Sequence, residues 1–81
     1  MATADKTLEK MKNNPRGWRI EDLLAMAKRY GIQVRKSGSS HVHFYHDDMI
    51  EHISIPAHKP VKPVYIENFL RFVDALKEKT S

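Results

Sequence analysis

The stretch Lys36–His46 reads KSGSSHVHFYH, and it decides how the rest of the 81-residue chain is interpreted. Its first half is small and rich in hydroxyl groups around Gly38, a composition that favours a turn. From His41 onward apolar and polar residues alternate with period two, which is typical of a half-buried strand. The pattern therefore predicts that His41 lies where a loop enters a strand, on the strand's exposed face.

Two further short segments, 32–36 and 52–55, are also predicted to be strands, and a polar turn is expected at 47–51. The short links between the strands favour a three-stranded antiparallel meander. One face of this sheet is expected to be apolar and to contain Ile32, Val34, Val42, Phe44, Ile53 and Ile55. The other face is expected to be polar and to carry Gln33, Arg35, His41, His43, Tyr45, His52 and Ser54.

Helices are predicted over residues 3–14, 20–30 and 63–79, because apolar residues recur there at spacings of three and four. Gly31 suits the end of the second helix, and Pro63 the start of the third. The expected fold is a single α+β domain over residues 1–81, in the order α-α-β-β-β-α, with helices on one face of the sheet. Without its first helix this order is that of a double-stranded-RNA-binding domain, although fold alone does not assign function.

Composition narrows the class of protein. The formal net charge is +4, which favours an anionic partner such as nucleic acid, but such a charge is also common for solubility alone. Cysteine is absent, so neither disulfides nor thiolate zinc sites are expected. No secretory signal and no apolar run long enough for a membrane span is apparent, and we expect a cytoplasmic protein without a membrane partner.

Three motifs carry a resemblance to a known family. They are NPRGW at 14–18, SGSSH at 37–41 and IPAHKPVKPVY at 55–65. In this order and spacing, from about Leu8 to Leu76, the chain resembles the HicA toxins of bacterial HicA–HicB toxin–antitoxin pairs.

The resemblance implies a fold like that of double-stranded-RNA-binding domains and an mRNA interferase, an endoribonuclease that acts independently of the ribosome. It implies a HicB antitoxin that covers the active site. The essential histidine of the family follows a Gly-Ser element and maps onto His41. This chain has Gly-Ser-Ser-His where Gly-Ser-His is commoner, which leaves His43 as the second candidate.

RNA cleavage without a metal uses the substrate's own 2′-hydroxyl as nucleophile, and it needs a base, an acid and positive charge near the phosphate. His41 is the predicted proton-transfer residue, acting as either base or acid, and His58 is a candidate for the second polar group. Predicted contacts with RNA come from side chains and from one backbone amide, and they are Arg35, Lys36, Gly38, Ser39, Ser40, Lys59 and Lys62. Taken singly, each of these cations is more often a solvated surface charge.

Other interpretations use the same residues. A zinc site built on His41 and His43, with His46, His52 or His58, is disfavoured because His46 falls on the opposite face. A nucleophilic serine is disfavoured because no acidic residue lies near the histidines in the required pattern. No cofactor is expected. At the level of function, the alternatives are a non-catalytic RNA-binding module and a protein-interaction domain with an acidic partner.

Overall fold

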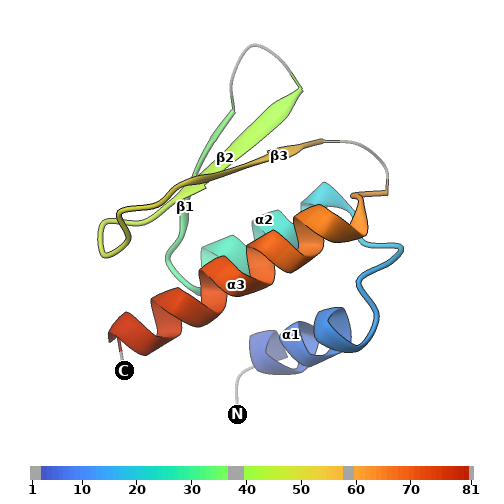
Figure 1. The fold of residues 1–81 in the computed structure, drawn as a ribbon, viewed down its shortest axis with the longest axis horizontal. Helices are drawn as coiled ribbons and strands as arrows, with labels where there is room; N and C mark the ends of the chain where they lie inside the picture. Colours follow the sequence, from blue (N-terminus) through green and yellow to red (C-terminus); the bar gives the residue numbers. More distant parts are fainter. Residues whose placement is uncertain (1–2, 37–39, 58–59, 81) are drawn as a thin grey trace.

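The computed structural model describes residues 3–36, 40–57 and 60–80. Its elements are α1 (Thr3–Asn13), α2 (Ile20–Arg29), β1 (Gln33–Lys36), β2 (His41–Tyr45), β3 (Ile53–Pro56) and α3 (Pro63–Thr80) (Figure 1). The order α-α-β-β-β-α is the one predicted, and the bounds differ from the predicted ones by at most one residue. None of the described helices is long and apolar enough to cross a membrane.

The elements form three layers (Figure 1). The sheet is one layer, and α2 and α3 lie together against one of its faces. The first helix packs against α3 on the side away from the sheet. None of the described helices covers the opposite face of the sheet. This uncovered face, called the outer face below, contains His41.

The sheet is antiparallel in the order β1-β2-β3, as predicted. Phe44 of β2 lies opposite both Val34 and Ile53, and Val42 lies opposite Ile55. Because residues directly opposite each other project to the same face, these five side chains share the face that α2 and α3 cover.

The exposure of Val34 differs from the predicted burial of the apolar face. Val34 lies on the predicted face, but 36% of it remains exposed, whereas Phe44 opposite it is fully buried. All four residues of β1 are exposed, because β1 is an edge strand that the two helices cover incompletely.

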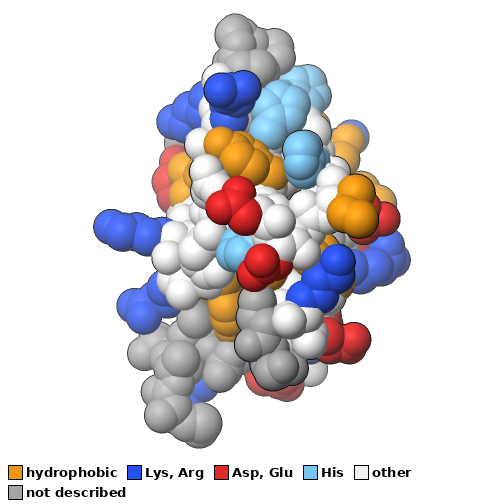
Figure 2. Space-filling view, turned by 90° about the vertical axis from the view of Figure 1, so that its left-hand side faces the viewer, with side chains coloured by type: hydrophobic (Ala, Val, Ile, Leu, Met, Phe, Trp, Pro, Cys, Tyr) orange, Lys and Arg blue, Asp and Glu red, His pale blue; other side chains and the backbone are white. Residues whose placement is uncertain are grey.

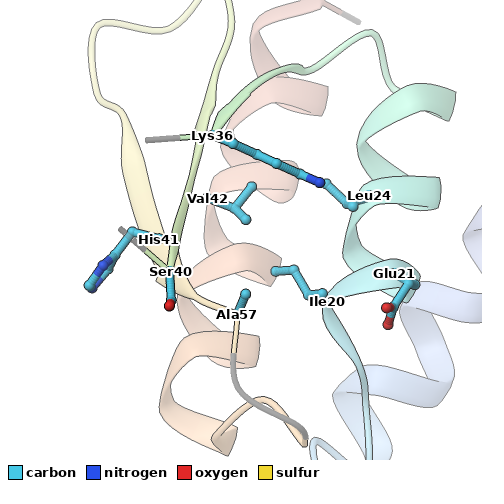
Figure 3. Close-up of a pocket in the computed structure, with 8 residues that line it drawn as sticks. All are labelled: Ile20, Glu21, Leu24, Lys36, Ser40, His41, Val42 and Ala57. Atoms are coloured by element: carbon cyan, nitrogen blue, oxygen red, sulfur yellow. The ribbon is translucent and has the colours of Figure 1, made fainter. Parts of the chain in front are cut away.

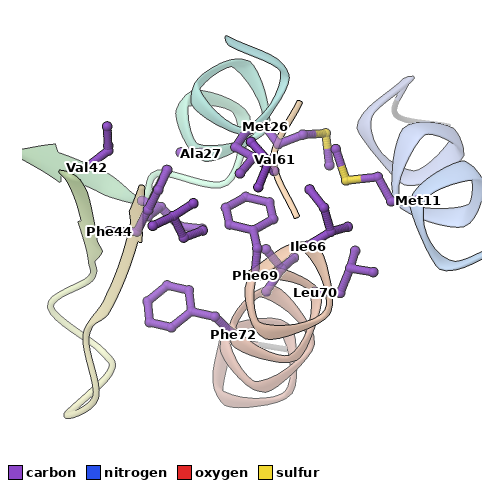
Figure 4. Close-up of a cluster of buried hydrophobic side chains, with 14 of the residues drawn as sticks. Met11, Met26, Ala27, Val42, Phe44, Val61, Ile66, Phe69, Leu70 and Phe72 are labelled. Atoms are coloured by element: carbon purple, nitrogen blue, oxygen red, sulfur yellow. The ribbon is translucent and has the colours of Figure 1, made fainter. Parts of the chain in front are cut away.

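The core lies between the sheet and the helices (Figure 4). Phe44 meets Phe69 of α3 edge to face, with ring centroids 5.3 Å apart and an interplanar angle of 68°. Met11 of α1 and Met26 of α2 extend toward each other on the far side of the helical layer (Figure 4). The first helix thus contributes to the same core as the sheet.

Two turns flank the first two strands: one joins α2 to β1, and the other joins β2 to β3. Gly31 has a φ of 70°, a left-handed conformation that favours glycine. It follows α2 and lets the N–H of Ile32 donate to the carbonyl of Ala27 at 2.8 Å. The sequence predicts a polar turn between β2 and β3, but Met49 within this turn is buried and belongs to the core.

Candidate functional site

His41 is the first residue of β2, and its side chain is exposed. It lies opposite Pro56 of β3, and the N–H of Ala57 donates to the carbonyl of Ser40 at 2.7 Å. These backbone contacts hold the start of β2 against the chain that leaves β3. In Figure 3 the imidazole points away from α2, toward the outer face, as the alternation predicted.

Arg35 and His43 extend the site along the outer face. His43 is half-buried and lies between Arg35 on β1 and Ser54 on β3. It is two residues from His41 on the same face, so the two backbone positions are roughly 7 Å apart along the strand. The sheet therefore aligns two imidazoles and a guanidinium, a set of groups suited to an anionic ligand. Among the described residues, no side-chain hydrogen bond or ion pair involves the guanidinium of Arg35.

A hollow of about 450 Å³, called the outer-face hollow below, lies on this face and is lined by Arg35, His43, Tyr45 and His52. The rings of Tyr45 and His52 are 5.8 Å apart between centroids and tilted by 51°. Sequence reasoning placed both residues on the outer face but gave Tyr45 no role and His52 only one in the disfavoured metal site. The signal for a shared site was the hairpin itself, which brings the end of β2 beside the start of β3.

Lys36 lies on the other face of the sheet from Arg35, although the two residues are adjacent in the sequence. It pairs with Val42 and so projects toward the helical side of the sheet. There it lines a second hollow, of about 250 Å³, together with His41 and with residues of α2 that include Ile20 and Leu24. Figure 3 shows its side chain extending across to Leu24. The structure therefore separates two cations that the sequence analysis grouped together as phosphate contacts.

Lys62, another predicted RNA contact, is exposed immediately before α3. It lines a third hollow, of about 500 Å³, together with Arg16. The adjacent Val61 is buried, and its N–H donates to the carbonyl of Trp18 at 2.8 Å, which ties this connector to the residues before α2. Lys62 and Arg16 thus form a basic pair that does not line the outer-face hollow.

Four of the predicted site residues, Gly38, Ser39, His58 and Lys59, lie outside the described residues. Ser40 is described and exposed, and it lines the hollow that contains Lys36. The described part of the site therefore rests on His41, His43 and Arg35.

Within the described ranges, no three His, Asp or Glu side chains lie close enough together to hold a metal ion. His46, one of the histidines in the zinc alternative, lies beyond the end of β2. Its Nδ1 accepts the N–H of Asp48 at 2.9 Å, so it takes part in the β2–β3 turn.

Charge is unevenly distributed along the strands. In Figure 2 histidine side chains gather beside Lys and Arg side chains at the top of the view, and acidic side chains lie lower down, among further Lys and Arg side chains. Asp47 and Asp48 follow His46 in the turn after β2, and the Nε2 of Gln33 donates to Asp47 at 3.2 Å. An anion on the outer face is thus favoured near His41 and disfavoured near the β2–β3 turn.

Comparison with known proteins gives one match. A family model described as HicA toxin of bacterial toxin-antitoxin matches residues 20–74 of the 81-residue chain, which is well over half of it. The match spans α2, the whole sheet and most of α3, and it leaves out α1. No curated protein and no solved structure gives a significant match.

Proposed function

The chain belongs to the HicA toxin family of bacterial toxin–antitoxin systems, and from this premise we propose that it is an endoribonuclease that cleaves mRNA. Cleavage is independent of the ribosome and of metal ions, and a HicB-type antitoxin neutralises the protein. The observation that carries the proposal is the placement of His41, exposed at the start of β2 and on the same open face as the Arg35–His43 pair.

In the proposed reaction the 2′-hydroxyl of one nucleotide attacks the adjacent phosphorus atom, and the bond from phosphorus to the 5′-oxygen breaks. A base takes the proton from the 2′-hydroxyl, and an acid gives a proton to the departing 5′-oxygen. The products are a 2′,3′-cyclic phosphate and a 5′-hydroxyl. Histidine suits either role because its ordinary pKa lies near neutral pH.

His41 performs one of the two proton transfers. His43 is the second candidate from the described residues, and His58 is retained from the sequence analysis. The guanidinium of Arg35 projects to the same face as His43, where it stabilises negative charge that develops on the phosphoryl oxygens. Lys36 and Lys62 are proposed to contact other phosphates of the RNA. Lys36 lines a hollow that His41 also lines, and Lys62 lines another hollow with Arg16.

A cleavage assay with purified protein tests the proposal. RNA is incubated with the wild type, His41→Ala and His41→Gln, with and without a chelator. We expect chelator-resistant cleavage by the wild type and a fall of about 10²- to 10⁴-fold in both variants. His43→Ala, assayed in parallel, decides between the two candidate histidines, and Glu67→Gln on α3 is the control for an exposed substitution. Cleavage that persists in His41→Ala, or that the chelator abolishes, would contradict the mechanism.

Growth provides an independent readout. Expression of the wild type alone is expected to arrest bacterial growth, and co-expression of a HicB-type antitoxin is expected to restore it. Expression of His41→Ala at the same level is expected to leave growth unaffected. Normal growth at high expression of the wild type would count against the toxin activity of this chain.

A second candidate function is a non-catalytic RNA-binding module. The element order from α2 to α3 favours it, because domains with this order bind RNA without cleaving it. The same experiment separates the two functions. RNA binding without cleavage by the wild type supports the binding module, whereas cleavage that depends on His41 supports the ribonuclease.

A further inference from the structure

We infer that the outer-face hollow lined by Arg35, His43, Tyr45 and His52 binds an unpaired nucleobase beside the cleavage site, which makes the substrate single-stranded RNA. The inference rests on the proposed function and deepens it, because it names the form of RNA that the site accepts.

The hollow is accessible and held on a rigid support. Helices α2 and α3 cover only the opposite face of the sheet (Figure 1). Tyr45 is the last residue of β2 and is half-buried, so the strand holds its ring in place. His52 is exposed one residue before β3. A volume of about 450 Å³ falls within the range of small-molecule sites.

The two rings are arranged to receive a planar group. Their centroids are 5.8 Å apart and their planes are tilted by 51°, so the two rings contact each other as a tilted pair without stacking face to face. A base that lies on the face of one ring meets the other ring at its edge. Aromatic side chains on an exposed sheet bind RNA bases in this way, and they do so with little regard to sequence.

The acidic residues near these rings favour the binding of an uncharged base over that of a phosphate. Asp47 and Asp48 follow Tyr45 within three residues, and Glu51 directly precedes His52. These carboxylates repel a phosphate but not an uncharged base. Arg35 lines the other side of the hollow, toward His41, where a phosphate is favoured.

Spacing along β2 links the base to the reaction. His41, His43 and Tyr45 alternate onto the same face, and the positions of His41 and Tyr45 are roughly 14 Å apart at the usual rise per residue. A flexible single strand can place a phosphate near His41 and a base on Tyr45. In a duplex both faces of each base are already stacked, so a duplex cannot occupy the rings.

The test is a binding measurement in the His41→Ala background, so that the RNA is not cleaved. Fluorescence anisotropy compares a labelled single-stranded RNA with the same strand in a duplex. We expect Tyr45→Ala and His52→Ala to weaken single-strand binding by roughly 5- to 100-fold each and to leave duplex binding unchanged. Tyr45→Phe, which keeps the ring, is expected to bind like the parent. Circular dichroism checks folding, and if Tyr45→Ala fails to fold, the exposed His52→Ala decides.

The outcomes are distinguishable from those of the proposed function. Single-strand binding that is unchanged in His52→Ala and in a folded Tyr45→Ala overturns the base site, even where the cleavage assay establishes the ribonuclease. Equal affinity for single strand and duplex overturns it as well. Weakened single-strand binding together with no cleavage by the wild type would support the base site and contradict the ribonuclease.

Discussion

Arg35 of β1 and His43 of β2 lie directly opposite each other in the antiparallel ladder, and both side chains project to the uncovered face of the sheet. Lys36, the next residue, pairs with Val42 and projects to the helical face. Of two neighbouring cations, only Arg35 shares a face with the histidines of β2. Their contributions to RNA cleavage are therefore expected to differ.

Arg35→Ala is expected to reduce the cleavage rate and to lower the slope of log affinity against log salt concentration by about one, because one phosphate contact is lost. Lys36→Ala is expected to reduce the cleavage rate less than Arg35→Ala does, because Lys36 projects to the helical face of the sheet. Lys10→Ala, which removes an exposed cation from α1, is the control for net charge. Affinity titrations at several salt concentrations, together with single-turnover cleavage, measure both effects. A larger loss of cleavage in Lys36→Ala than in Arg35→Ala would contradict the assignment.

Phe44→Ala is expected to lower the free energy of unfolding by about 3–5 kcal/mol, because it removes a fully buried ring from the heart of the core. The loss includes the edge-to-face contact with Phe69. Val34→Ala, on the same face of the sheet but at its exposed edge, is expected to cost about 1 kcal/mol or less. Urea denaturation measures both changes. Similar losses in the two variants would show that β1 is better covered than described.

Met11→Ala is expected to cost about 2–5 kcal/mol, because Met11 is fully buried although α1 lies outside the matched family region. The ion pair between Lys12 and Asp74 joins α1 to α3 at 3.3 Å, but 42% and 44% of the two side chains remain exposed to solvent. Asp74→Asn is therefore expected to cost less than about 1 kcal/mol. Thermal unfolding compares the two. If Asp74→Asn were the more destabilising, surface charge and not burial would hold α1 in place.

Gly31→Ala is expected to destabilise the protein by about 1–2 kcal/mol, because its φ of 70° places a Cβ in the disfavoured left-handed region. Gly31→Asn is expected to cost less, since asparagine tolerates this conformation better. Chemical denaturation of both variants gives the order. Equal stability of Gly31→Ala and the wild type would mean that the turn into β1 adopts another backbone conformation in solution.

Local patterns were sufficient to predict the helices, the strands and their faces. The alternation through Val42 and Phe44 and the stop at Gly31 depend on residues close together in the chain, and the structure confirms them. The outward position of His41 followed from the same alternation.

Tertiary structure alone decided the burial of particular side chains and the grouping of distant ones. Val34 is exposed and Met49 is buried because the reach of the helices over the sheet depends on packing between elements, which no local pattern encodes. The register between β1 and β2 places Arg35 opposite His43, and the hairpin brings Tyr45 beside His52. Periodicity specifies the face on which a side chain lies, whereas its neighbours on that face depend on pairing between strands.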